Sequence, residues 1–467
     1  CIFRQILTGL NEIELQKEKI LKGSPKIEII KSCMIDGGIV KLKKVERYKR
    51  KFEESELNFS FFIPSSGSGS RMFQFLYDFL GSTSDIDSGM VELFINKLKE
   101  FAFFNVLPEE VKYKIKHRDF DITEIVDFIV QDTGLGYGSL PKALIPFHKF
   151  GPFVINPVQE HVIQGFKLGN KNNSFHFTVS EQFINEFKSS IHSLQQLIGS
   201  RIDYSFSVQN PETHSVVFDD ALEVVKEENG EIFKRPSGHG ALIDNLNAIE
   251  SDIVFIKNID NVQHQSNSKI SKDGISCISG LLIAIKEEVD LLLTLNGIAF
   301  QEGFINLNKE FQLFEESILN DLEEKQLKEL LKRPLRVCGM VRNEGQPGGG
   351  PFWVRSSQGV LSKQIVEKSQ IDLKSNQFKI LAQSTHFNPV FMALSMKDSD
   401  GIKYDLKKYI NHNEYFVVKK SQKGKSVQFI ERPGLWNGGM YHWNSVFIEL
   451  DPKAFTPVKT VLDLLKP

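Results

Sequence analysis

The stretch FSFFIPSSGSGSRM, residues 59–72, decides the fold of this chain. Its apolar first half predicts a buried strand, and the apolar spacing around and after Arg71 predicts a helix over 70–80. A strand that ends in a glycine-rich turn before a helix suits a phosphate group, because glycine lets backbone N–H groups approach the anion and a helix N-terminus adds partial positive charge. Arg71 would supply a planar cation for phosphate oxygens.

Two common phosphate motifs are excluded at this turn. A Walker loop ends in Gly-Lys-Ser or Gly-Lys-Thr, whereas Gly69 is followed by Ser70 and Arg71, and the dinucleotide fingerprint needs a third glycine where this chain has Met72. The turn resembles the signature loop of the sugar-nucleotide pyrophosphorylases, which are nucleotidyltransferases of the GT-A superfamily. The resemblance implies nucleotide binding by three loop residues, Ser66, Gly67 and Gly69. From the residues alone, an ordinary strand–helix turn with a solvated arginine is an equal alternative.

Composition excludes several classes of protein. The net charge of −2 over 467 residues gives no basic field for nucleic acid or an anionic membrane, and no apolar run approaches the ~20 residues that span a bilayer. The four cysteines lie far apart without a CxxC pair, so neither a zinc site nor a disulfide framework is indicated. We expect a cytoplasmic protein. The sequence does not indicate an oligomeric state.

Strands that alternate with helices set the expected organisation. We expect helices near 4–22, 70–80, 90–103, 123–131, 157–168 and 181–198, and strands near 58–63, 174–179, 202–208 and 253–256. This alternation predicts an α/β fold with a three-layer, Rossmann-like (GT-A), mainly parallel sheet. The predicted parts are an N-terminal helical extension (1–56), a nucleotide-binding core (57–262), a helical insertion with helices at 276–297 and 308–332 (263–334), and a sugar-site half with a smaller β-rich C-terminal region (335–467). In the first part, residues 24–56 are expected to add a second helical piece.

Lys142 is the second candidate for phosphate chemistry. It lies in LPKALIP, residues 140–146, between turn residues and an apolar run, where a surface lysine is the commoner role. Pro141-Lys142 resembles the Pro-Lys pair that pyrophosphorylases carry downstream of their glycine-rich loop. The resemblance implies that Lys142 stabilises charge on the α-phosphoryl group. It also implies that Arg71 stabilises charge on the β- and γ-phosphates.

A turn with two glycines, Gly238 and Gly240, is the candidate base pocket. Glycines on either side of His239 would let backbone pack against a flat base, although the same residues could simply begin a helix. UDP-sugar pyrophosphorylases have a similar order, with a Gln-Pro segment before a Gly-X-Gly turn that holds uracil. The resemblance implies that Gln209, Gly238 and Gly240 frame the base and that His239 lines the pocket. Here Asn210 separates the glutamine from its proline.

Asp260 is the candidate metal ligand. It follows the apolar strand 253–256, and a carboxylate at the end of a buried strand is costly unless it is paired or bound to metal. Mg²⁺ takes one or two carboxylates together with phosphate oxygens and waters. Residues 259–261, Ile-Asp-Asn, resemble the Val-Asp-Asn of UDP-sugar pyrophosphorylases, which implies Mg²⁺ ligation by Asp260. An aspartate that only shapes a turn is the alternative.

Two glycine-rich loops are candidates for sugar binding. They are VRNEGQPGGGPFW, residues 341–353, and GLWNGGMYHWNS, residues 434–445. Indole faces and amide groups suit a sugar ring, and the second loop ends in a Trp-Asn-Ser that resembles that of some sugar-nucleotide pyrophosphorylases. We therefore predict sugar contacts from Asn343, Trp443 and Asn444. Rigid turns that fill a core are the alternative.

The motifs together imply a nucleotidyltransferase. Their order matches the pyrophosphorylases over residues 57–262, and the whole chain resembles an uncharacterised bacterial family of the same superfamily, of the kind found in Bacteroidetes. The implied reaction transfers a nucleoside monophosphate, UMP from UTP, to a sugar 1-phosphate with Mg²⁺ and releases pyrophosphate. Ser65 and Ser66 stand where active families carry smaller residues, so an inactive nucleotide- or sugar-nucleotide-binding protein is the alternative.

Overall fold

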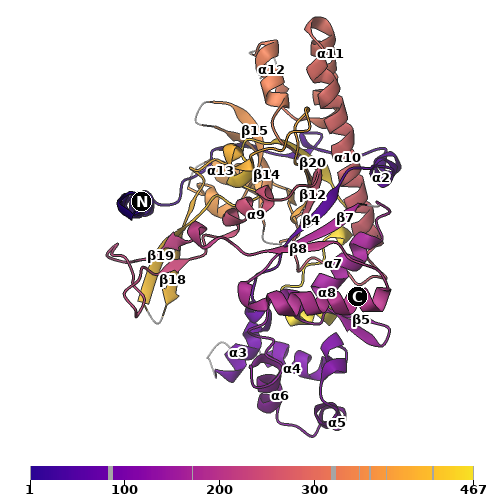
Figure 1. Cartoon of the computed structure of the whole chain (residues 1–467), viewed down its shortest axis with the longest axis vertical. Helices are drawn as coiled ribbons and strands as arrows, with labels where there is room; N and C mark the ends of the chain where they lie inside the picture. The colour runs from indigo at the N-terminus through magenta and orange to yellow at the C-terminus, as the bar shows by residue number, and fades with distance from the viewer. Residues whose placement is uncertain are drawn as a thin grey trace. The chain divides into compact units, whose positions relative to one another are not determined.

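The computed structural model describes most of the chain (Figure 1). The chain divides into two compact units, each built from segments that alternate along the sequence. The first unit contains Cys1–Lys51, Gln209–Val254 and Ile278–Leu450; the second contains Phe52–Val208, Phe255–Cys277 and Asp451–Pro467. The described residues are 2–81, 88–170, 172–316, 322–345, 348–356, 359–374, 376–422 and 425–465, and the side chains of 2–11 are outside the description.

The second unit is built on parallel strands. They are β4 (Phe59–Pro64), β7 (Asn173–Thr178) and β8 (Tyr204–Ser207), in the order β4-β7-β8, and β12 (Ile253–Lys257) is the neighbour of β4 on its other side. Residues 59–63 are all buried, which is why this strand reads as a continuous apolar run. The Phe255 ring lies 6.0 Å from that of Phe61 on the adjacent strand.

Helices and a hairpin complete the second unit. They are η1 (Ser70–Phe73), α3 (Gln74–Leu80), α4 (Ser88–Lys97), η2 (Ala102–Val106), α5 (Glu109–His117), α6 (Ile122–Val130), η3 (Lys142–Leu144), β5 (His148–Phe150), β6 (Phe153–Ile155), α7 (Pro157–Phe166), η4 (Glu181–Phe183), α8 (Ile184–Ile198), η11 (Pro452–Ala454) and η12 (Val461–Leu465). A phenylalanine-rich core formed by α3, α4 and α6 buries Met72 and Phe73 directly after the glycine-rich turn. That burial fixes where the turn begins and ends.

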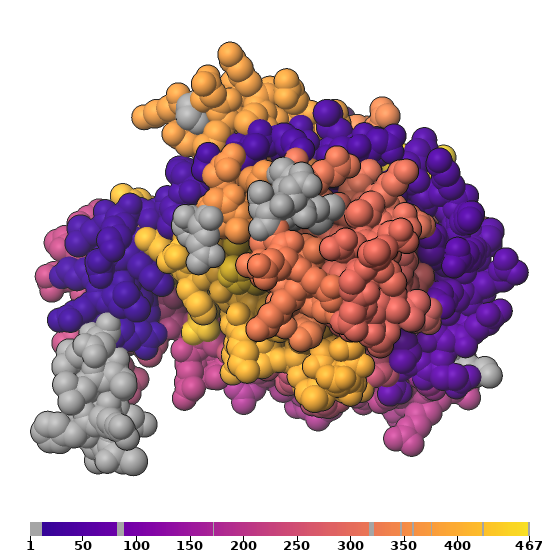
Figure 2. Space-filling view, turned by 90° about the horizontal axis from the view of Figure 1, so that it is seen from above, coloured from indigo at the N-terminus to yellow at the C-terminus, as the bar shows by residue number. Residues whose placement is uncertain are grey.

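The first unit contains several sheets. In one, β2 (Met34–Ile35), β3 (Gly38–Val40), β20 (Asn444–Glu449) and β13 (Leu335–Arg342) are parallel, while β16 (His386–Phe387) and β17 (Phe391–Ser395) are antiparallel to β13. Antiparallel sheets are formed by β1 (Ile29–Ser32), β14 (Gly350–Arg355) and β15 (Leu361–Val366), by β10 (Phe218–Asp219), β19 (Lys425–Glu431) and β18 (Phe416–Gln422), and by β9 (Ser215–Val216) with β11 (Lys234–Arg235). The β1–β14 ladder brings the N-terminal segment against the later part of the unit, as the indigo and orange atoms of Figure 2 show.

The helices of the first unit are α1 (Ile2–Lys22), η5 (Pro211–Thr213), η6 (His239–Leu242), α9 (Ile243–Asn247), α11 (Gly297–Phe311), α12 (Glu324–Leu331), η8 (Lys368–Gln370), α13 (Gln377–Ala382), η9 (Leu406–Tyr409) and η10 (Gly438–Met440). Helices α2 (Val45–Glu53) and α10 (Lys269–Thr294) contain residues of both units. Within the described part of the chain, no helix has the length and apolarity that a membrane span requires.

The mixed α/β class, with mostly parallel strands and a β-rich region after residue 335, is confirmed. Two predicted elements differ from those in the structure. The helix expected at 308–332 is divided, because α11 ends where Gln312 adopts a left-handed φ of 50° and α12 starts anew at the capping box of Glu323 and Gln326. Of residues 24–56, where a helical piece is predicted, 45–53 form helix α2, whereas three short strands lie within 29–40.

Candidate phosphate site and base loop

Backbone pairing fixes the turn after β4. The Gly69 N–H donates to the carbonyl of Leu140 at 2.8 Å, and the Lys142 N–H donates to the carbonyl of Gly67 at 3.1 Å. At the end of the strand, Ser65 is buried; its N–H donates to the Thr178 carbonyl and its hydroxyl to the Ile63 carbonyl, each at 2.9 Å. The predicted loop and the predicted lysine segment therefore lie side by side.

The exposed part of the turn has free donors. Ser66 and Gly67 are exposed, and no described group accepts a hydrogen bond from the N–H of either residue. Two consecutive exposed N–H groups are available to donate hydrogen bonds to an anion. Because the Ser65 side chain is turned inward, its Cβ and hydroxyl do not crowd this surface.

The two glycines of the turn have different roles. A Cβ on Gly69 would lie 2.6 Å from the Ile145 Cδ1 atom and 2.9 Å from the Tyr137 carbonyl oxygen, so packing excludes any side chain there. A Cβ on Gly67 would meet nothing within 4 Å. The fold therefore requires glycine at 69, whereas the space at 67 is open to a ligand.

This contrast makes a matched pair of substitutions. Gly69→Ala should lower the free energy of unfolding by about 1–3 kcal/mol, because the added methyl overpacks the turn. Gly67→Ala should leave stability unchanged and weaken nucleotide binding, since only a ligand would meet its methyl group. Chemical denaturation and equilibrium binding of UTP measure the two effects. If Gly67→Ala binds UTP as the unaltered protein does, this turn is not where the nucleotide lies.

Two lysines contact one carboxylate next to the turn, and the charge of an arginine acts on one of them. The Lys142 Nζ atom lies 3.3 Å from Asp260 Oδ2 and donates to the Val458 carbonyl at 2.8 Å. The Lys459 Nζ atom lies 2.9 Å from the same Asp260 oxygen. Arg71 is exposed, and its charge acts on Lys142. The predicted residues Arg71, Lys142 and Asp260 are thus brought together.

The electrostatics favour an anion at this point. Burial lowers the pKa of Lys142; the Asp260 carboxylate opposes that shift, and the charges of Lys459 and Arg71 add to it. Lys142 and Lys459 share the single carboxylate of Asp260, and a bound phosphate would offset the repulsion between these cations.

Lys459 is a residue that sequence reasoning missed. The C-terminal segment is held to the turn after β12, since the Val458 N–H donates to the Asp260 carbonyl at 3.0 Å and the Thr456 N–H donates to Asn261 Oδ1 at 3.1 Å. No motif surrounds Lys459, which lies 199 residues beyond its carboxylate partner. Only the fold brings it to the site.

The residues fit Mg²⁺ in a limited sense. Both ammonium groups lie on Asp260 Oδ2, and no described group donates a hydrogen bond to Oδ1. Among the described residues, no three His, Cys, Asp or Glu side chains are placed to share a metal. One carboxylate oxygen suits an ion that arrives with a nucleotide and keeps phosphate and water ligands, rather than a preformed protein cage.

The predicted base residues lie in the first unit, where the turn is tightly packed. Gly238 has a φ of +76°, and a Cβ on Gly240 would lie 2.1 Å from the Pro433 carbonyl oxygen. His239 stacks on Trp436 with ring centroids 4.1 Å apart, its Nδ1 accepts from the Leu435 N–H, and burial lowers its pKa to about 4. A neutral His239 therefore holds the 434–445 loop.

The remaining predicted base and sugar residues are mostly engaged within the protein. Gln209 donates to the Thr213 hydroxyl at 3.3 Å, and the exposed Asn343 accepts from the Gly345 N–H at 2.9 Å. Trp443 is buried, and its indole N–H has no hydrogen-bond partner among the described residues. Asn444 is buried and donates to the Leu330 carbonyl at 2.8 Å.

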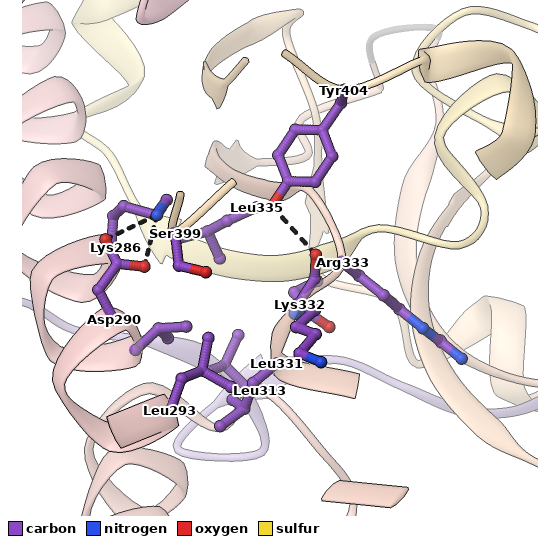
Figure 3. Close-up of a pocket in the computed structure, with 12 residues that line it drawn as sticks. Lys286, Asp290, Leu293, Leu313, Leu331, Lys332, Arg333, Leu335, Ser399 and Tyr404 are labelled. Atoms are coloured by element: carbon purple, nitrogen blue, oxygen red, sulfur yellow. Dashed lines mark hydrogen bonds and ion pairs between the residues drawn. The ribbon is translucent and has the colours of Figure 1, made fainter. Parts of the chain in front are cut away.

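Asn444 also lines the small cavity of Figure 3. Its volume is about 10 Å³, which has room for about one water molecule. The polar groups around it satisfy one another: Lys286 pairs with Asp290 at 2.7 Å, and the Tyr404 hydroxyl donates to the Lys332 carbonyl at 3.0 Å. A sugar ring would not fit this cavity.

Comparison with known proteins places the chain in a family. The family model described as a domain of unknown function (DUF4301) matches residues 4–467. The chain belongs to the DUF4301 family. A search of curated proteins returned no match.

Solved structures resemble this DUF4301 protein over most of its length. A protein assigned as a UDP-N-acetylglucosamine pyrophosphorylase from Entamoeba histolytica is 12% identical with a TM-score of 0.49, over 94% of this chain and 84% of that one. UDP-glucose pyrophosphorylase from Leishmania major, solved with UDP-glucose, is 11% identical with a TM-score of 0.45, over 97% and 74%. UDP-glucose phosphorylase from Trypanosoma brucei is 13% identical with a TM-score of 0.39, over 95% and 69%. With TM-scores below 0.5, the chemistry of the DUF4301 chain rests on its own residues.

Proposed function

We propose that this DUF4301 protein is a GT-A-type nucleotidyltransferase that transfers UMP from UTP to a sugar 1-phosphate and releases pyrophosphate. The observation that carries the proposal is that Lys142 and Lys459 both contact Asp260, with the charge of Arg71 acting on Lys142, beside a turn with free N–H groups. An excess of fixed cations next to open backbone donors is what a triphosphate requires.

The chemistry asks mainly for positioning and charge neutralisation. A phosphate oxygen of the sugar 1-phosphate forms a bond to the α-phosphorus in line, and the bond from that phosphorus to the bridging oxygen breaks as pyrophosphate leaves. The Ser66 and Gly67 N–H groups and Arg71 would bind the β- and γ-phosphates, while Lys142 would neutralise charge at the α-phosphoryl group. Asp260 would hold Mg²⁺, which supplies further charge neutralisation when bound.

The base and sugar assignments rest on the motif resemblance. Gln209, Gly238 and Gly240 are proposed to frame uracil, with His239 as a support of the pocket through its stack on Trp436. Asn343, Trp443 and Asn444 remain proposed sugar contacts.

A second candidate is a binding protein without catalysis. The observation that favours it is that Asp260 Oδ2 already accepts two ammonium groups, which neutralise the carboxylate in place of a metal. Such a protein would bind a UDP-sugar with equal affinity in the presence and absence of Mg²⁺, whereas transfer from UTP would need the ion.

The test is pyrophosphate release from UTP and Mg²⁺ across a panel of sugar 1-phosphates. We expect pyrophosphate release with a particular sugar 1-phosphate. Arg71→Ala should lower kcat/KM roughly tenfold or more, which corresponds to about 1.4 kcal/mol, because an exposed charge acts in a high dielectric. Lys17→Ala, on helix α1 of the first unit, is the matched control. Absence of release with every nucleoside triphosphate, together with Mg²⁺-independent binding of UDP-sugars, would select the binding protein.

A further inference from the structure

A second cavity is lined by residues of the first unit, none of which is assigned to phosphate transfer. Its volume is about 240 Å³, enough for a small organic molecule by the measure in which one water needs roughly 10–15 Å³. Helix α1 forms one wall through Gln16 and Lys19, and the β19 end and the segment after it form another through Ile430 and Arg432. Gly240 of the proposed base loop also lines it.

The polar groups of this cavity are mainly basic. Lys19, Arg432, His214 and His412 line it, and Glu12 is the acidic residue among the lining side chains. Glu12 accepts a hydrogen bond from Gln16 at 3.2 Å. Neither Lys19 nor Arg432 forms an ion pair with a carboxylate of the described residues. The cavity is therefore lined by two cations that form no ion pair with a described carboxylate.

The two cations are close enough to act on each other. Burial lowers the pKa of Lys19, and the charge of Arg432 lowers it further. Burial likewise lowers the pKa of His412, with Lys19 and Arg432 adding to the shift. Like charges held together in a partly desolvated cavity are unfavourable in the free protein, and an anion between them removes that cost.

The lysine is also held in place. Its Nζ atom lies 5.0 Å from the ring centroid of Tyr415, and the Tyr415 hydroxyl donates to the Lys19 carbonyl at 3.3 Å. The Arg432 N–H donates to the Ser237 carbonyl at 2.8 Å, which fixes the backbone at the other wall. Cations positioned in this way lose little entropy when they bind an anion.

We propose that the cavity lined by Lys19, Arg432 and Gly240 is an anion site that binds the phosphate group of a small molecule. A guanidinium and an ammonium that line one cavity suit the charge of a phosphate, and the cavity leaves room for an organic group attached to it. Because Gly240 lines the cavity, a molecule bound there would lie directly against the 238–240 turn.

The first experiment uses the intact wild-type protein. Amine acetylation followed by mass spectrometry should show that inorganic phosphate slows modification of Lys19 at least fivefold, with sodium chloride of equal ionic strength as the reference. Lys17, which lies on the same helix as Lys19, is the internal control. Its ammonium pairs with Glu223 at 3.8 Å, and it should be modified equally fast in both salts. Equal modification of Lys19 in phosphate and chloride would overturn the proposal.

Variants then locate the site and its ligand. Lys19→Gln and Arg432→Gln should each weaken phosphate binding in calorimetry roughly tenfold or more, about 1.4 kcal/mol, and Lys17→Gln should not. Glucose 6-phosphate in a parallel arm distinguishes a phosphate ester from free phosphate as the better ligand. Lys142→Met, altered in the proposed transferase site, should leave the protection of Lys19 intact. These measurements contain no nucleotide, so failure of the transferase proposal would not affect them; equal phosphate affinity in all variants would contradict the anion site.

Discussion

Lys142→Ala should lower kcat for nucleotidyl transfer roughly 10²–10³-fold, the usual cost of deleting one preorganised stabiliser of transition-state charge. The effect should exceed that of Arg71→Ala, because Lys142 is largely shielded from water and held by Asp260 and the Val458 carbonyl, whereas Arg71 is exposed. KM for UTP should change less than kcat. Steady-state kinetics measure both quantities, and unchanged kcat would remove Lys142 from the chemistry.

The pH profile separates a charge role from a structural one. The protonated ammonium is the active form, so activity should fall as pH rises through the pKa of Lys142, and burial lowers that pKa below the ordinary 10.5. Lys459 repels the same charge, so Lys459→Ala should move this alkaline limb to higher pH while lowering kcat less than Lys142→Ala does. Ethylamine should restore part of the activity of Lys142→Ala. A purely structural lysine would show neither the shift nor the rescue.

The part of the site that lies within one continuous segment can be predicted from local sequence. The buried strand, the glycine-rich turn and the helix after it follow from apolar runs and glycine placement within residues 59–80, and the structure has them there. Lys142 lies against the turn because residues 67–69 and 140–142 pair through their backbones, a contact that motif order only implied. Long-range packing of a single lysine has no local signature, which is why Lys459 was not predicted.

The 434–445 loop shows where composition is ambiguous. Its glycines, tryptophans and amides suit a sugar, yet the same residues pack the loop internally through the His239–Trp436 stack and the Asn444 hydrogen bond. The residue that anchors it, Arg336, lies in the strand LRVCGMVR, in which residues 335–341 are buried and Arg342 at the end is exposed. An arginine in such a run should itself have been the signal, because a fully buried cation needs specific partners.

Arg336→Met should lower the free energy of unfolding by about 1.5–3 kcal/mol at pH 8, the range for a hydrogen bond made by a charged group. Arg336 is fully buried; its Nε donates to the Ser445 hydroxyl at 2.8 Å and its Nη1 to the Trp436 carbonyl at 2.7 Å. Its charge also acts on Glu414, a buried carboxyl that accepts from Asn411 Nδ2 at 3.0 Å. Methionine fills the volume but leaves these acceptors and the carboxylate without their cation. Denaturant titration at several pH values measures the loss.

The loss should be smaller at pH 5 than at pH 8, and the sign follows from Glu414. Burial raises the pKa of Glu414 from 4.5 to about 7, with Asn411 and Arg336 opposing the rise, so the stability linked to its protonation is present below pH 4.5 and lost as pH rises through about 7. Without Arg336 the pKa of Glu414 rises further. The free energy of unfolding of the variant then falls more steeply above pH 7, by up to about 1.4 kcal/mol per pH unit. Glu414→Gln combined with Arg336→Met should remove this extra dependence, since the carboxyl on which the Arg336 charge acts is then absent. An Arg336→Met cost that is equal at pH 5 and pH 8 would mean that the arginine supports the loop by hydrogen bonding and packing alone.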